Sequence, residues 1–232
     1  MIKIFAHRGA SGYELENSIE AFKLAILQGA DGIELDVQLS RDNNVVVFHD
    51  ESLKRVFGHD VYVKDLTFKE LQTLSNNRIC LLEEVLLLVK ENGIDLNIEL
   101  KNNLFDYPGL EKMVYDLVNT YDLFNRVTYS SFNHYSCYKL KKINQNNRVG
   151  ILFDEDFDNI ATYANKIGVD YIHPNYNLLN NDLLFSEARK YNLGINCWTV
   201  NTDEDFNRLK YLDLDIVITN YVDRAKKLMF HS

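Results

Sequence analysis

The chain contains little cysteine and proline, and it has no long apolar run. Its three cysteines, Cys80, Cys137 and Cys197, lie far apart and are odd in number, which argues against both a disulfide framework and a zinc knuckle. No apolar run approaches the ~20 residues of a membrane-spanning helix, and residues 1–6 are too few for the apolar part of a signal peptide. We therefore expect a reducing, cytoplasmic location and no stable membrane insertion.

Basic residues are also few relative to acidic ones. There are 25 Lys and Arg against 34 Asp and Glu, a net charge of −9, so the overall field repels duplex nucleic acid and anionic membrane surfaces. We expect no nucleic-acid partner, and an anionic substrate would need local cations or a metal ion. With 46% hydrophobic and 25% charged residues and no Pro- or Ser-rich linker, the chain is typical of a globular protein. We expect a single domain over residues 1–232; nothing in the sequence indicates the oligomeric state.

Short runs of apolar, β-branched or aromatic residues recur along the chain and predict strands. Segments with apolar residues at helical spacing lie between most of them, such as the set Ile19, Phe22 and Ile26. Glycines fall between helical and strand-like stretches, where a left-handed helix cap is expected. The predicted strands are Ile2–Ala6, Gly32–Val37, Val45–Phe48, Leu96–Leu100, Val127–Ser130, Val149–Phe153, Val169–Ile172, Ile195–Trp198 and Ile216–Ile218. The predicted caps are Gly29, Gly93, Gly168 and Gly194.

Alternating strands and helices indicate a mainly parallel sheet, either open and doubly wound or closed as a (β/α)₈ barrel. A Gly-x-Gly-x-x-Gly turn, usual in dinucleotide-binding open sheets, is absent from the sequence, and polar residues follow many different strands, as in a barrel. We therefore predict a TIM barrel. The polar turn Arg41–Asn44 makes Val45–Phe48 an extra hairpin strand after the second strand, and Glu51–Asp65 an excursion on the catalytic face.

Two carboxylates alternate with apolar residues in Gly32–Val37, so Glu34 and Asp36 share one face of that strand. The alternative of a solvated face suits an edge strand, whereas in a barrel these side chains point inward, where unpaired charges are costly. Glu99 and Lys101 likewise share a face, either as a structural ion pair or as part of the same site. A third inward carboxylate, Glu99, completes an all-oxygen site suited to one Mg²⁺ or Ca²⁺, whereas zinc would prefer His or Cys.

His7 and His49 each end a strand-like run, and their imidazoles suit an acid and a base near neutral pH. Arg8 and Lys101 supply cations for an anionic substrate, and a guanidinium fits a phosphate group. Trp198 lies at a strand end, where it could form a wall of the substrate site or pack in the core. The remaining histidines, His59, His134, His173 and His231, are expected to be bystanders. The role of His173 is the most open, because it also ends a predicted strand.

The ordered motifs of the chain resemble those of the glycerophosphodiester phosphodiesterases, metal-dependent barrels related to phosphatidylinositol-specific phospholipases C. The resemblance runs from about Ile4 to Val222. It departs from the usual pattern at Leu15, Asn220 and Val222, none of which replaces a proposed catalytic group. The motifs are His7-Arg8-Gly9, Glu16-Asn17-Ser18, Gly29-Ala30-Asp31, Glu34-Leu35-Asp36-Val37, Val46-Val47-Phe48-His49-Asp50, Glu99-Leu100-Lys101, Ser131-Phe132, Trp198-Thr199-Val200-Asn201 and Ile218-Thr219-Asn220.

This resemblance implies hydrolysis of a small-molecule glycerophosphodiester to glycerol 3-phosphate and an alcohol. It implies metal ligation by Glu34, Asp36 and Glu99, proton transfer by His7 as base and His49 as acid, and phosphate contacts by Arg8 and Lys101. A single carboxylate cluster favours the glycerol 2-hydroxyl over a metal-activated water as nucleophile. Two alternatives stay open: a phospholipase C- or D-like barrel acting on lipid, and a non-catalytic phosphate-binding barrel. The preferred alcohol and the physiological ion are not indicated.

Overall fold

Eight parallel strands form a closed barrel in the part of the chain that the computed structural model describes, which comprises residues 2–155, 158–180 and 182–230. Strand β1 pairs with β10 on one side, through Phe5 and Ile218, and with β2 on the other, through Phe5 and Gly32, which closes the ring. The barrel strands are β1 (Lys3–His7), β2 (Gly32–Leu39), β5 (Asp95–Leu100), β6 (Val127–Ser131), β7 (Arg148–Phe153), β8 (Tyr171–Pro174), β9 (Gly194–Cys197) and β10 (Ile216–Thr219). The TIM-barrel prediction is confirmed.

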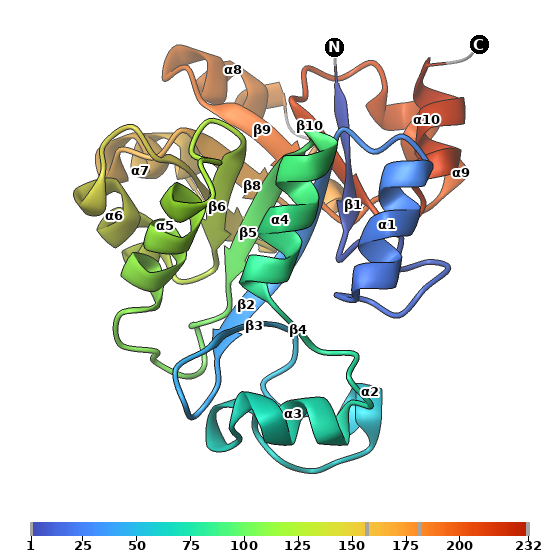
Figure 1. Ribbon diagram of the computed structural model, residues 1–232. Helices are drawn as coiled ribbons and strands as arrows, with labels where there is room; N and C mark the ends of the chain where they lie inside the picture. Colours follow the sequence, from blue (N-terminus) through green and yellow to red (C-terminus); the bar gives the residue numbers. More distant parts are fainter. Residues whose placement is uncertain (1, 156–157, 181, 231–232) are drawn as a thin grey trace.

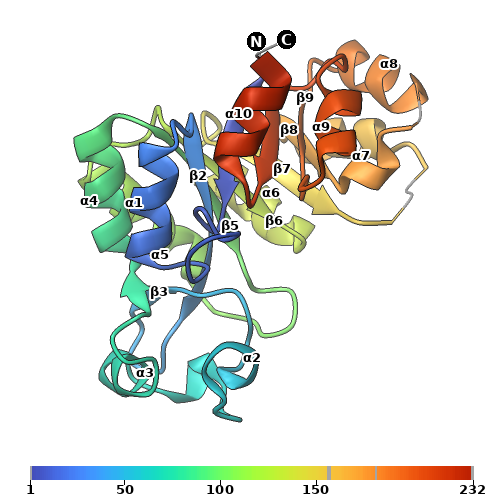
Figure 2. The same ribbon diagram turned by 90° about the vertical axis from the view of Figure 1, so that its right-hand side faces the viewer.

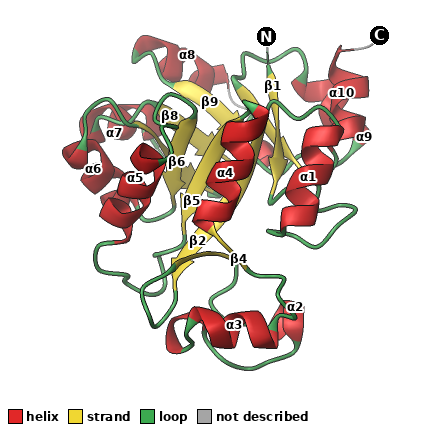
Figure 3. Ribbon diagram, viewed as in Figure 1, coloured by secondary structure: helices red, strands yellow, loops and turns green. Residues whose placement is uncertain are grey.

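Helices cover the outside of the barrel (Figures 1 and 3). The outward residues of β2, Ile33, Leu35 and Val37, belong to the same buried apolar core as Phe22 and Ala25 of α1. The outer helices are α1 (Ile19–Leu27), α4 (Leu82–Asn92), α5 (Leu110–Thr120), α6 (His134–Ile143), α7 (Ile160–Ile167), α8 (Asp182–Lys190), α9 (Asp203–Leu209) and α10 (Val222–Phe230), with a 3₁₀ turn, η2 (Tyr176–Leu178), after β8. Among the described helices, none is long and apolar enough to cross a membrane.

The inward face of the barrel carries buried polar residues beside the apolar cluster of Phe5, Ile216 and Ile218. Asn97 of β5 donates to Ser130 Oγ of β6 over 2.8 Å, and the Asn196 amide nitrogen of β9 lies 2.9 Å from His173 Nε2 of β8. All four residues are buried. Branched apolar residues usually fill this space, so these polar pairs mark the side of the interior formed by β5, β6, β8 and β9 as different from an ordinary barrel core.

An insertion follows the second strand at the catalytic end, as predicted. β3 (Val45–Val47) pairs antiparallel with β2 and with β4 (Cys80–Leu81). Helices α2 (Lys54–Phe57) and α3 (Phe68–Leu74) and the 3₁₀ turn η1 (Val63–Asp65) lie between β3 and β4. Figures 1 and 2 show them at the end of the barrel opposite the start of β1. The insertion has its own apolar core, made of Val46, Phe48, Leu53, Val63, Leu71 and Ile79.

Two local predictions are wrong. Gly29, Gly93 and Gly168 do adopt positive φ after their helices, but the left-handed residue after α8 is Asn192 (φ 54°), not Gly194. Gly194 is instead the first residue of β9, where a glycine is needed because a Cβ would lie 2.5 Å from the Tyr171 ring. Strand β8 begins at Tyr171 rather than at residue 169, since the amide of residue 169 still bonds Ala164 at the end of α7.

Candidate active site

Three carboxylates meet at the catalytic end of the barrel. Glu34 and Asp36 point inward from β2, and Glu99 of β5 is the direct strand partner of Asp36. One oxygen from each residue lies within 4.8 Å of the others, and all three residues are buried. The alternation of β2 and its register with β5 therefore produce the predicted cluster.

Burial and mutual repulsion make this cluster electrostatically unfavourable by itself. Burial and then Asp36 raise the pKa of Glu99, against the opposing effect of Lys101. Burial, together with Asp36 and Glu99, holds the pKa of Glu34 well above its usual value. For Asp36, burial raises the pKa, but the neighbouring Arg8, His49 and Lys101 and the hydrogen bond from Asn17 together outweigh it, so its pKa is lowered. Asp36 Oδ1 is also buried without a hydrogen-bond partner among the described residues. An all-oxygen set with an unpartnered donor atom fits a hard divalent cation.

Arg8 and Lys101 border the carboxylates. The Arg8 amide donates to Glu34 over 3.0 Å, and its Nε lies 3.3 Å from Asp36 Oδ2. Lys101 Nζ donates to Glu99 over 2.9 Å. Burial lowers the pKa of each cation, but the neighbouring carboxylates more than compensate and raise it. Both side chains therefore stay charged beside the cluster.

The two histidines have different partners. His7 Nδ1 lies 2.7 Å from the side-chain amide oxygen Oδ1 of Asn220, so the imidazole donates its Nδ1 proton there and leaves Nε2 free to accept one. Burial, followed by the charge of Arg8, lowers the pKa of His7 to about 4. His49 Nδ1 lies 2.6 Å from the Asp50 carboxylate, and its Nε2 lies 3.2 Å from Lys101 Nζ. One imidazole thus faces a neutral partner and the other a charged one.

One cavity of about 220 Å³ brings most of the predicted residues together. Asp36 is the exception, because it is buried beneath the cavity lining. Trp198 combines the two roles considered for it: it lines the cavity, and it also packs against Phe132 and the apolar residues of β1 and β10. The lining residues are His7, Arg8, Glu34, His49, Asn97, Glu99, Lys101, Ser130, Phe132, Leu152, His173, Trp198 and Ile218.

Sequence reasoning missed several side chains that support the site. Asn17 donates to Asp36 Oδ2 over 2.8 Å; its place in a family-like motif was the available signal. His173, expected to be a bystander, lines the cavity, but it is fully buried, and burial lowers its pKa to about 3. His59 and His134 do not line this cavity, and His231 lies outside the described residues.

Comparisons with known proteins agree with this geometry. The sequence model of the glycerophosphoryl diester phosphodiesterase family matches residues 7–224. A glycerophosphodiester phosphodiesterase of Caldanaerobacter subterraneus is 35% identical over 227 residues, which cover 94% of this chain and 93% of that protein. The crystal structure of a glycerophosphodiester phosphodiesterase from Thermotoga maritima is 31% identical and has a TM-score of 0.84, with 98% of each chain covered.

A more distant structure shares the fold. A phosphodiesterase of Oleispira antarctica, solved with the product sn-glycerol-3-phosphate, has a TM-score of 0.86 at 23% identity and covers 98% of this chain and 96% of its own. The matches confirm the predicted class of enzyme, a phosphoric diester hydrolase. The chain belongs to the glycerophosphoryl diester phosphodiesterase family.

Proposed function

We propose that this enzyme hydrolyses glycerophosphodiesters to glycerol 3-phosphate and an alcohol with the help of one divalent ion. The supporting observation is the shared cavity, whose lining includes His7 and His49, the cations Arg8 and Lys101, and two of the three converging carboxylates, with the third, Asp36, buried beneath it. The set contains an acid, a base and a binding site for a phosphate anion. None of these groups requires the substrate to lie in a membrane.

Glu34, Asp36 and Glu99 would hold the ion, because they supply three converging oxygen donors, of which Asp36 Oδ1 has no hydrogen-bond partner among the described residues. When bound, a Mg²⁺ or Ca²⁺ ion acts as a Lewis acid on the phosphoryl oxygens. Arg8 and Lys101 bind the same phosphate group from the protein side, as a guanidinium fork and a point charge respectively.

His7 acts as the base and His49 as the acid. His7 is held neutral by burial and by Arg8, with Nε2 ready to accept a proton. His49 has the Asp50 carboxylate to compensate the charge of its imidazolium form. For Nε2 to carry the proton, Lys101 Nζ, which lies 3.2 Å from it and can only donate, must turn to the substrate phosphate. The difference in partners supports the order of roles that the sequence resemblance implies.

The nucleophile is the glycerol 2-hydroxyl of the substrate. Its proton passes to His7 as its oxygen forms a bond to phosphorus, while the bond from phosphorus to the leaving oxygen breaks and His49 protonates the released alcohol. Water then opens the cyclic phosphate through the same histidines in reversed roles. An intramolecular hydroxyl has a high effective molarity and needs one base and one Lewis acid, which matches a site with one cluster of three carboxylates.

A substrate panel tests this function. Glycerophosphodiesters with different alcohols are incubated with the protein and a divalent ion, and the products are followed by ³¹P NMR. We expect glycerol 3-phosphate, preceded by a transient cyclic phosphate, and a greatly reduced rate for a 2-deoxyglycerol diester. Equal rates for the two substrates without a cyclic species would show direct attack by water. Activity confined to lysophospholipid vesicles would favour the lipid-acting alternative.

A further inference from the structure

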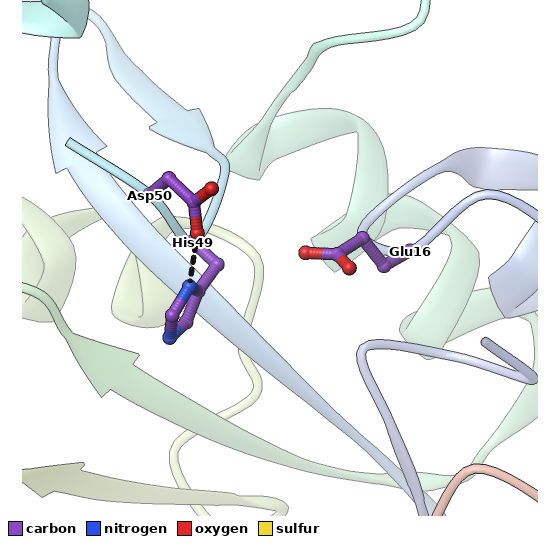
Figure 4. Close-up of side chains that lie close together, drawn as sticks. All are labelled: Glu16, His49 and Asp50. Carbon is purple, nitrogen blue, oxygen red and sulfur yellow. Dashed lines mark hydrogen bonds and ion pairs between the residues drawn. The ribbon is translucent and has the colours of Figure 1, made fainter. Parts of the chain in front are cut away.

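A second group of ligand-type side chains lies beside the cavity. Figure 4 shows the Glu16 carboxylate pointing toward the pair formed by His49 and Asp50. Atoms of these three residues lie within 4.8 Å of one another, and all three are partly buried. Glu16 comes from the loop between β1 and α1, whereas His49 and Asp50 stand just after β3.

An arginine already occupies this position. Arg55 of α2 binds Asp50 through Nε (2.6 Å) and one terminal nitrogen (2.9 Å). The two terminal nitrogens also bind Glu16, over 2.9 and 2.6 Å. Burial raises the pKa of both carboxyl groups, but the hydrogen bonds and charge of Arg55, together with those of Arg8 at Glu16 and of His49 at Asp50, outweigh it and lower both pKa values. The cluster is therefore a charge-compensated network, and we assign no metal ion to it.

Each carboxylate that Arg55 binds also touches a side chain of the active site. The same Asp50 oxygen that accepts from Arg55 lies 2.6 Å from His49 Nδ1. The Glu16 oxygen that accepts from Arg55 also accepts from Arg8 over 2.9 Å. The contacts thus run from one guanidinium to the acid on one side and to the phosphate-binding arginine on the other.

We propose that Arg55 is a positioning residue of the insertion, which orients His49 through Asp50 and Arg8 through Glu16. This inference rests on the proposed function, because it uses the roles given there to His49 and Arg8. A planar guanidinium with its donors in fixed directions can bind two carboxylates at once, whereas an ammonium offers a single point charge. The two active-site side chains are thereby tied to one rigid group.

The insertion presents Arg55 on a short, well-defined helix. Leu53 just before α2 is fully buried in the core of the insertion, and Gly58 ends the helix in the left-handed conformation. The Arg55 side chain itself is 52% exposed, so its truncation leaves no core cavity. A loss of activity in such a variant would therefore reflect lost positioning rather than lost packing.

Arg41 provides a matched control. It lies in the turn between β2 and β3 and also holds the insertion in place, by donating to the Asp65 carbonyl and to Glu70, and its side chain is 55% exposed. It does not line the cavity, and its partners do not contact His49 or Arg8 among the described residues. Arg41→Ala thus reports the effect of loosening the insertion without disturbing the network.

The test measures steady-state kinetics and thermal unfolding of wild type, Arg55→Ala, Arg55→Lys and Arg41→Ala. We expect Arg55→Ala to lower kcat/KM by ~10–100-fold, the range typical of residues that orient functional side chains through hydrogen bonds. Arg55→Lys should recover little, and added guanidinium ion, at concentrations that do not denature the protein, should partly restore Arg55→Ala. Arg41→Ala should stay within twofold of wild type.

Two further readouts separate positioning from a structural effect. The fall in kcat for Arg55→Ala should be smaller with a nitrophenyl ester, which needs little protonation, than with an alkyl diester. Affinity for inorganic phosphate, measured by calorimetry, should fall several-fold because Arg8 loses its support.

The inference is overturned if wild type hydrolyses diesters and His49→Ala does not, yet Arg55→Ala keeps the wild-type rate and phosphate affinity. It is also overturned if Arg41→Ala matches the loss. Wild-type behaviour of Arg55→Ala would overturn the inference without contradicting the proposed function. Full activity of His49→Ala would instead contradict the role of His49 as the acid.

Discussion

At the scale of single residues, the sequence predicts which side chains share a face of a strand better than it predicts their partners. The alternation of β2 is enough to place Glu34 and Asp36 on one face. The partner of His7, by contrast, is Asn220, 213 positions away in the chain. Such a contact depends on the closure of the barrel, so no local pattern could have identified it.

The unequal partners of the two histidines lead to a kinetic prediction. His7→Ala and His49→Ala should each lower kcat by ~10²–10⁴-fold, the usual contribution of a general acid or base. A nitrophenolate leaving group needs little protonation and should partly rescue His49→Ala alone. Circular dichroism would confirm that both variants fold, and equal rescue of both would contradict the assignment of base and acid.

A second prediction concerns the repulsion within the carboxylate cluster. Because the pKa of Glu34 is raised on folding from its ordinary value of 4.5, this carboxyl group binds more protons in the ion-free folded state than in the unfolded state. Its contribution to stability is therefore lost as the pH rises above about 4.5 and through the raised pKa. The lowered pKa values of His7 and His173 act in the opposite direction, but they are common to wild type and Glu34→Gln, so the stability of wild type relative to Glu34→Gln should fall as the pH rises; relative to Glu91→Gln, at an exposed site on α4, it should not.

Thermal unfolding in excess chelator, scanned across pH, checks this prediction. Added Mg²⁺ or Ca²⁺ should raise the Tm of wild type more than that of Glu34→Gln, because the ion offsets the charge. A Tm of ion-free wild type that rises with pH in parallel with that of Glu34→Gln would contradict the predicted sign.

At the scale of elements, runs of β-branched residues identified all eight barrel strands and β3, but the two-residue strand β4 and helices α2 and α3 escaped prediction. These short elements have too few residues for a periodic pattern, and they are stabilised by the core of the insertion rather than by local propensity. Gly194 was misread for a related reason. A glycine before a strand can be a helix cap, but it can also be required because a neighbouring side chain occupies the position of a Cβ, as the Tyr171 ring does at Gly194.

The fit between β7 and β8 gives an element-scale prediction. A Cβ at Gly150 would lie 2.3 Å from His173 Nε2, and His173 is fully buried against it. Gly150→Ala should therefore destabilise the fold by ~1–3 kcal/mol through overpacking. In a double-mutant cycle measured by urea unfolding, His173→Ala should cost less in the Gly150→Ala background than in wild type. Strictly additive effects would show that the two positions do not compete for space.

At the scale of the whole molecule, barrel closure turns residues from distant parts of the chain into one site. The loop after β1 supplies Arg8 and Glu16, the insertion supplies His49 and Arg55, and β5 supplies Glu99. The net charge of −9 makes the local cations of the cavity necessary for an anionic substrate. Composition and strand ends predicted this general design, while the network around Arg55 became visible only in three dimensions.

The most direct test of the central claim is the rate of glycerol 3-phosphate release from a glycerophosphodiester as a divalent ion is returned to chelator-treated protein. We expect no turnover in excess chelator, saturable recovery in wild type as Mg²⁺ or Ca²⁺ is added, and no recovery in Asp36→Ala. Asp36 is chosen because it is buried beneath the cavity and its Oδ1 has no other partner among the described residues. Full turnover in excess chelator, or by Asp36→Ala, would contradict the account.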